Sequence, residues 1–168
     1  QLTNLENQLI IDNVFDLVMI LDASGRVVRM NRRGYQLTGL SPNAVNGNGI
    51  ENLVIHGELT TRTRKEWLAR YGWRDSGTGS GRTPSIDAVV TTVVREEFPV
   101  DLRIVCLTNL EKATTGYIVS ATDMRITRQL IKEISDREYA TRDLALSESK
   151  FSRMFIFNPT GILIVDLD

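Results

Sequence analysis

Apolar and polar residues alternate along this chain with two different periods. A continuous apolar run at 17–21 is too short to form a helix of its own, and the turn-forming residues Asp22-Ala23-Ser24-Gly25 follow it. Apolar character resumes at 27–30. The pattern therefore predicts a β-hairpin over 17–30.

Three later segments rich in β-branched residues, 86–94, 98–108 and 116–122, are typical of an antiparallel meander. Helical spacing of apolar residues appears at 2–11, 31–37, 61–73 and from 124 to about 150, and short helical turns are expected within 43–58. The order of these elements predicts an α+β fold. It would have one five-stranded antiparallel sheet, short central helices, an N-terminal helix and a long C-terminal helix.

Composition narrows the class of protein. The 168 residues carry a net charge of -1, which gives no basic surface for nucleic acid. A single cysteine, Cys106, rules out an internal disulfide framework and suits a reducing compartment. No apolar run is long enough to span a bilayer, so we predict a cytoplasmic chain whose parent protein could be anchored elsewhere.

Several motifs, in the correct order, resemble those of the PAS domain family. FDLVMILDASGRVVRMNRRGYQLTGLSP is similar to that family's first two strands and the following helix, with Gly25 in the turn and Asn31 at the helix start. EEFPVDLRI resembles the penultimate strand, and GYIVSATDMRIT resembles the last strand with its acidic exit, here Asp123. The resemblance covers roughly residues 10–125 and implies a PAS-like sheet.

The resemblance also suggests a division of the chain. Residues 1–12 would be an entry helix, 13–123 the PAS domain and 124–150 a signalling helix. The final segment, 151–168, repeats the pattern of residues 13–25 and resembles the truncated start of a second PAS domain.

PAS domains hold a pocket between the sheet and the short helices. Side chains two apart on a strand share a face, so the family's usual register assigns an apolar wall. We expect the candidate pocket to be lined by Trp67, Tyr71, Val90, Val100, Leu102, Ile104, Cys106, Tyr117 and Val119. The alternative is a pocket filled by these side chains themselves.

The resemblance leaves the cofactor unknown but makes two cofactors poor fits. Haem-binding members supply a histidine that would fall near Arg64, whereas the single histidine is His56, expected to be exposed or to cap a helix. A LOV-type flavin adduct needs a cysteine among the central helices, and Cys106 lies on a predicted strand as a small buried hydrophobe. A non-covalent flavin stays open, and no cluster has the spacing of a metal site.

No nucleophile–base pair is evident, so we predict a regulatory module and not an enzyme. We expect it to sense a small molecule or a protein partner and to relay the change through Asp123 to a downstream domain. Bacterial histidine kinases and cyclic-dinucleotide cyclases or phosphodiesterases share this layout. The alternative is a ligand-free dimerisation scaffold. A parallel homodimer is expected along an interrupted seam made of Leu5, Leu9, Leu130, Ile134 and Leu144.

Overall fold

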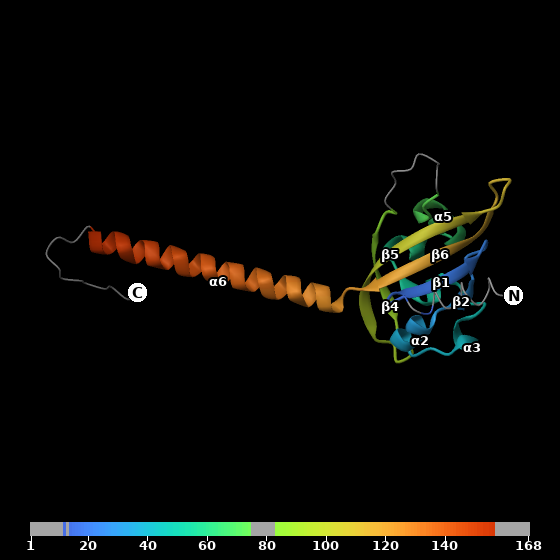
Figure 1. The fold of residues 1–168 in the computed structure, drawn as a ribbon, viewed down its shortest axis with the longest axis horizontal. Helices are drawn as coiled ribbons and strands as arrows, with labels where there is room; N and C mark the ends of the chain where they lie inside the picture. The colour runs from blue at the N-terminus through green and yellow to red at the C-terminus, as the bar shows by residue number, and fades with distance from the viewer. Residues whose placement is uncertain (1–11, 13, 75–82, 157–168) are drawn as a thin grey trace. The chain divides into compact units, whose positions relative to one another are not determined.

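A computed structural model describes residues 12, 14–74 and 83–156. The predicted hairpin is present as strands β1 (Leu17–Asp22) and β2 (Val27–Met30). The meander consists of β4 (Ile86–Thr91), β5 (Glu97–Thr108) and β6 (Thr114–Asp123). All neighbouring strands pair antiparallel in the order β2-β1-β6-β5-β4-β3 (Figure 1). The α+β prediction is therefore confirmed.

The sheet has one strand more than the five predicted. The additional strand, β3 (Val54–Ile55), has two residues and pairs with Val89 and Val90 of β4. It lies within the region expected to form only helical turns. The first meander strand is also shorter than predicted, because it ends at Thr91 and the chain then turns.

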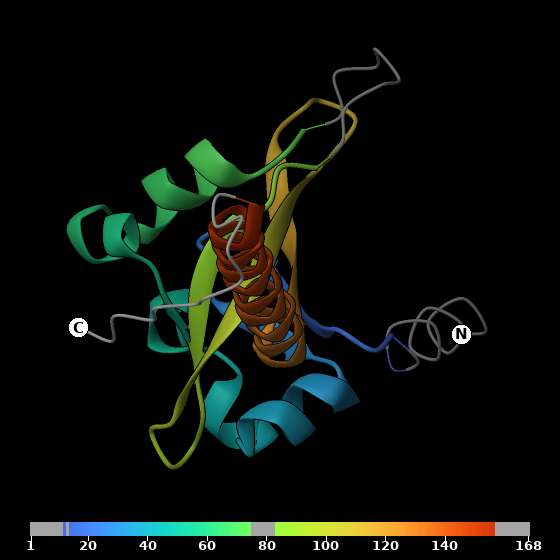
Figure 2. The ribbon, with the colours of Figure 1, turned by 90° about the vertical axis from the view of Figure 1, so that its left-hand side faces the viewer.

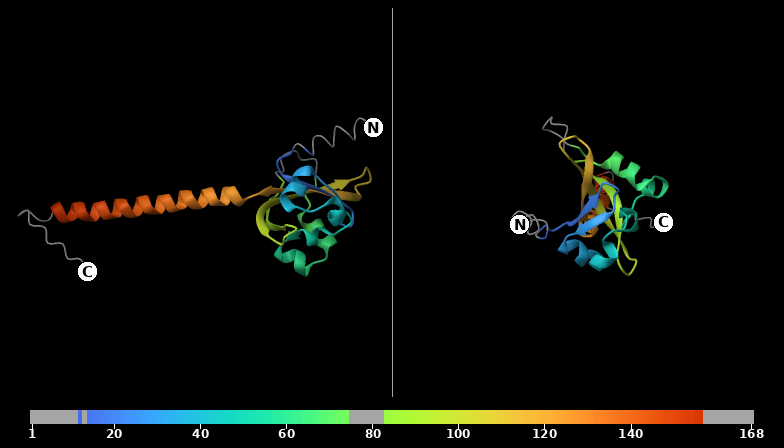
Figure 3. Two further views of the ribbon diagram at one scale, coloured as in Figure 1. Left: turned by 90° about the horizontal axis from the view of Figure 1, so that it is seen from below. Right: turned by 90° about the vertical axis from the view of Figure 1, so that its right-hand side faces the viewer.

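Short helices precede and follow β3. They are α2 (Arg32–Thr38), α3 (Pro42–Val45), the 3-10 helix η1 (Ile50–Asn52), α4 (Gly57–Thr61) and α5 (Arg64–Tyr71). The predicted helix at 61–73 is present as α5, shorter than predicted at both ends, and Arg62 and Thr63 separate it from α4. The short helices lie on one face of the sheet (Figure 3), with α5 near one end and α2 and α3 near the other (Figure 1).

Strand alternation places the core between the sheet and these helices. Along β5 the side chains of Phe98, Val100, Leu102, Ile104 and Cys106 are buried, and the residues between them are more exposed. This is the register that the resemblance to PAS domains implies. Figure 2 shows the short helices around this side of the sheet.

A buried asparagine joins the start of the sheet to the first helix. Asn31 is completely buried, and its Oδ1 accepts hydrogen bonds from the amides of Val18, at 3.0 Å, and Gly34, at 2.9 Å. Its Nδ2 donates to the carbonyl of Asp16 at 3.0 Å. One side chain therefore caps α2 and holds the end of β1.

The chain divides into two units, residues 1–125 and residues 126–168. Nearly all of helix α6 (Arg125–Ile156) belongs to the second unit. It extends past the predicted end at 150 and into the segment assigned to a second PAS domain. The entry-helix leucines Leu5 and Leu9 and the apolar run at 162–165 lie outside the described residues, so both hypotheses about them stay predictions.

Candidate functional site

The predicted pocket wall forms one continuous buried surface. Trp67 of α5 and the predicted residues of β4, β5 and β6 belong to a single core cluster, and Tyr71 packs against it partly buried. The register across the strands brings the wall together, since Ile104 lies opposite Val119 and Cys106 lies opposite Tyr117. These residues share a face as predicted; whether they hold a ligand stays a prediction.

The polar groups of this wall are few. Cys106 is a buried free thiol whose Sγ lies 3.6 Å from the hydroxyl of Thr114. Burial raises the pKa of the Tyr117 hydroxyl, and the nearby Cys106 adds to this effect. The wall is therefore apolar apart from these two groups.

Three aromatic rings meet where α5 covers the sheet. The Trp67 ring centroid lies 5.2 Å from that of Tyr71 and 5.7 Å from that of His56. The indole Nε1–H of Trp67 donates to His56 Nδ1 at 3.2 Å. The same nitrogen accepts a hydrogen bond from the Glu58 amide at 3.3 Å and so caps α4, which is one of the two alternatives expected for His56. The contact of His56 with Trp67 was not predicted.

Charged residues surround the edge of this cluster. The Glu58 carboxylate lies 3.5 Å from Arg70 Nε and 3.8 Å from Arg62 Nε. Burial raises the pKa of the Tyr71 hydroxyl, and a hydrogen bond to Glu58 raises it further. Tyr71 therefore stays protonated and tied to Glu58 at neutral pH.

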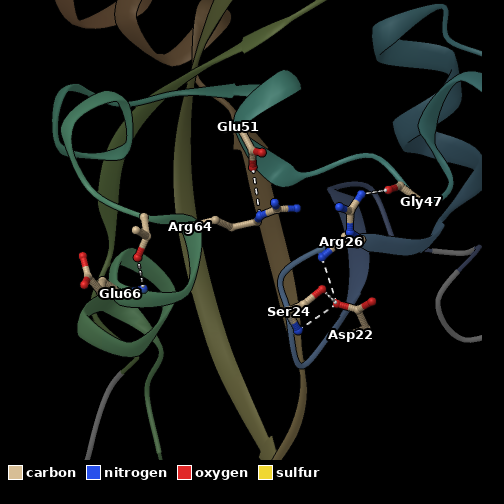
Figure 4. Close-up of polar contacts among 8 residues, drawn as sticks. Asp22, Ser24, Arg26, Gly47, Glu51, Arg64 and Glu66 are labelled. Carbon is tan, nitrogen blue, oxygen red and sulfur yellow. Dashed lines mark hydrogen bonds and ion pairs between the residues drawn. The ribbon is translucent and has the colours of Figure 1, made fainter.

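Arg64 occupies the position that the resemblance assigns to a haem ligand. Its Nε lies 3.3 Å from Glu51 Oε2, so the two side chains join α5 to η1 (Figure 4). A Cβ atom at Gly25 or Gly49 would overlap the Arg64 side chain, so a substitution at either position would have to displace it. A guanidinium cannot ligate iron, and among the described residues no group of three histidine, cysteine, aspartate or glutamate side chains is placed to hold a metal ion.

The turn between β1 and β2 is closed by its own aspartate. Asp22 Oδ1 accepts hydrogen bonds from the Ser24 amide at 2.8 Å, the Ser24 hydroxyl at 2.7 Å and the Arg26 amide at 3.0 Å (Figure 4). Burial opposes ionisation of this carboxyl, but these donors outweigh it and lower its pKa. Gly25 has φ +81°, the left-handed conformation that favours glycine. The cluster is therefore a structural turn next to Arg64.

The exit from the sheet is held by a second aspartate. The Asp123 carboxylate accepts from the amide of Arg125 at 3.0 Å and from its guanidinium, with Nη2–Oδ2 at 2.6 Å. These hydrogen bonds lower the pKa of Asp123 although burial opposes them. The guanidinium also lies over the ring of Phe98, and the Met124 amide donates to the Pro99 carbonyl at 2.9 Å. The predicted relay residue thus joins β5, β6 and the first residue of α6.

The seam residues of α6 project into solvent. Leu130, Ile134 and Leu144 are 52%, 57% and 62% exposed. None of the helices in the described ranges is long and apolar enough to cross a membrane.

Comparison with known proteins decides the family. A family model described as the PAS fold matches residues 5–124. This chain belongs to the PAS family. PAS domains are sensory and signalling modules and are not catalytic.

Solved PAS structures resemble the chain in fold at low sequence identity. The PAS domain of an HTR-like protein from Haloarcula marismortui is 15% identical, with a TM-score of 0.54 over 72% of this chain and 91% of that one. A PAS domain from a two-component sensor histidine kinase is 11% identical, with a TM-score of 0.55 over 73% and 96%. A Rhodobacter sphaeroides LOV protein is 15% identical, with a TM-score of 0.55 over 74% and 69%. No curated protein sequence matches significantly.

Proposed function

We propose that this PAS domain detects a small apolar molecule, or a protein partner, at the inner face of its sheet and relays the change into helix α6. The observation that supports the proposal is a chain of contacts from the buried face of the sheet to the residues where the chain leaves β6. Asp123 lies opposite Val100, a pocket-wall residue, in the β5–β6 pairing. Arg125 binds both Asp123 and the buried ring of Phe98. A change in the inner face of β5 therefore acts directly on the first residue of α6.

The exposed stripe of α6 supports a homodimer as the output stage. Leu130, Ile134 and Leu144 follow the three and four spacing of a coiled-coil seam, with Arg137 and Thr141 between them. Two copies in parallel would bury these side chains but would also bring Arg137 opposite its equivalent. Such a seam is weak, and a few kcal/mol from the sensor domain can then change its population.

The downstream domain we propose is a histidine kinase or a cyclic-dinucleotide cyclase or phosphodiesterase of a cytoplasmic bacterial signalling protein. The similarity to a PAS domain of a two-component sensor histidine kinase favours the first of these. A ligand-free dimerisation scaffold is the alternative, and the dense packing of Trp67 and the strand residues in one core cluster is the observation that favours it.

Native mass spectrometry and an absorbance scan of the purified chain separate the two functions. A sensor should retain a small molecule in near-stoichiometric amount, or take one up from a panel of small apolar compounds with a shift in melting temperature. We expect a colourless protein without a Soret or flavin band, because the wall offers no haem ligand and few polar groups to orient a flavin. Failure to retain or bind any compound while the chain still dimerises would favour the scaffold.

A further inference from the structure

His56 accepts two hydrogen bonds that could not be predicted from its position in the sequence. It is the only histidine of the chain, and it lies between β3 and α4. Its Nδ1 accepts two N–H groups, the indole of Trp67 at 3.2 Å and the amide of Glu58 at 3.3 Å. One unprotonated ring nitrogen therefore joins α5 to the first turn of α4.

Neither of these two donors can act as an acceptor instead. An indole N–H and a backbone amide can donate a hydrogen bond and cannot accept one. When the imidazole becomes an imidazolium, both of its nitrogens carry protons and Nδ1 loses its lone pair as an acceptor. Protonation of His56 must therefore break both hydrogen bonds at once.

The charged groups around the ring do not restore these bonds. Glu58 of α4 is the nearby carboxylate, and it is already engaged by Arg62, by Arg70 and by the hydroxyl of Tyr71. Tyr71 packs edge-on against the imidazole, with ring centroids 5.4 Å apart. A positive charge at His56 would thus add a third cation beside Arg62 and Arg70, which already share the Glu58 carboxylate.

We propose that His56 is an acid-sensitive latch between α4 and α5. Protonation opens it, uncaps α4 and leaves the indole N–H of Trp67 without its acceptor. Because Trp67 is completely buried against the pocket wall, a lost acceptor there is costly and the ring must shift to find another. The helical cover of the core then loosens on acidification, whether or not the pocket holds a ligand. Histidine is the side chain whose charge most commonly changes between pH 5 and 8.

Nuclear magnetic resonance of the full chain tests the latch directly. The two tryptophans give two indole N–H signals, and a Trp73→Phe variant assigns them. Between pH 8 and pH 5 the Trp67 indole signal should shift reversibly, with the same midpoint as the ring signals of His56. A His56→Asn variant keeps a side-chain oxygen that can cap α4 and accept from the indole, but it has no proton to gain. The Trp67 shift should be lost in that variant.

Two results would overturn the proposal. In the unmutated chain, His56 could titrate while the Trp67 indole signal stays in place. Alternatively, the Trp67 shift could persist unchanged in the His56→Asn variant, which would assign it to another group. If His56→Asn does not fold, the shared or separate midpoints in the unmutated chain still decide the question.

Discussion

The guanidinium of Arg125 lies over the ring of Phe98, with its Cζ atom 4.6 Å from the ring centroid. Phe98 belongs to the buried core, and Arg125 is the first residue of α6. The same guanidinium binds the carboxylate of Asp123 at the end of β6. Two neighbouring strands therefore hold the residue with which the helix begins.

A double-mutant cycle should detect this contact. Arg125→Ala and Phe98→Leu should each lower the free energy of unfolding, and the double variant should lose less than the sum, by about 0.5–1 kcal/mol. Urea denaturation measures the three values. Lys132→Ala, elsewhere on α6, combined with Phe98→Leu is the control and should be additive within about 0.5 kcal/mol. Equal coupling in the two cycles would contradict the contact.

The stability that Asp123 provides should depend on pH. Its hydrogen bonds from Arg125 lower its folded-state pKa below the ordinary value of 3.8. The contribution is therefore complete above the unfolded-state value, about 3.9, and is lost as the pH falls through the lower folded-state pKa. Asp123→Asn should melt at a lower temperature than the unmutated chain at pH 7. The difference should close in acid, below about pH 4; a difference independent of pH would show that the charge of Asp123 is not involved.

Removing the Asn31 side chain should be among the more damaging single changes. Asn31→Ala leaves the amides of Val18 and Gly34 without their acceptor, and each buried unsatisfied donor costs about 1–3 kcal/mol. Thermal or urea unfolding would measure the loss. Asn43→Ala removes the same group from an exposed position of α3 and should change stability by less than about 0.5 kcal/mol. Similar losses in both variants would refute this role of Asn31.

The strands could be predicted from the sequence because alternation with a period of two is typical of half-buried strands, and the resemblance to PAS domains indicated which face is buried. β5 is the clearest case, since all its predicted wall residues are buried. The two-residue strand β3 could not be predicted, because its pairing is determined by β4 and not by its own composition. Local patterns carry no information about such partners.

The polar contacts of the site were less predictable for the same reason. Asp22 and Asp123 contact residues two to four positions away, within reach of local turn and exit motifs. The contacts of His56 with Trp67 and of Arg64 with Glu51 span more than ten residues and depend on how α4 and α5 fold back. The signal available in the sequence for the first contact was the spacing of His56 and Trp67, which lie on either side of the break between α4 and α5.

Gly49 and Gly57 differ in what an added side chain would meet. A Cβ atom at Gly49 would overlap the Glu51 carboxylate and the Arg64 guanidinium, so Gly49→Ala must push this ion pair apart. Both clashes are with the ends of flexible, partly exposed side chains that can move aside, so we expect a loss of less than about 1 kcal/mol in unfolding free energy. A Cβ atom at Gly57, the first residue of α4, would meet nothing within 4 Å, and Gly57→Ala should be neutral or stabilising by up to about 1 kcal/mol. A loss well above about 1 kcal/mol for Gly49→Ala would show that these two side chains cannot move aside.

The weak seam of α6 can be tested by strengthening it. In the proposed parallel dimer Arg137 lies between Ile134 and Leu144 on the seam, opposite the same residue of the second copy. Arg137→Leu removes this repulsion and adds an apolar side chain, whose full burial contributes about 1.5–3 kcal/mol. The dimer should then tighten by about tenfold or more, as 1.4 kcal/mol corresponds to tenfold in affinity.

Sedimentation velocity over a range of protein concentrations measures this change. Lys132→Leu is the matched control, because it also replaces one cation with leucine but lies on the opposite side of the helix. It should leave the association unchanged. Equal tightening in both variants would indicate nonspecific hydrophobic association, and no tightening in either would exclude this seam as the contact between copies. Only a response confined to Arg137→Leu supports α6 as the output stage of the sensor.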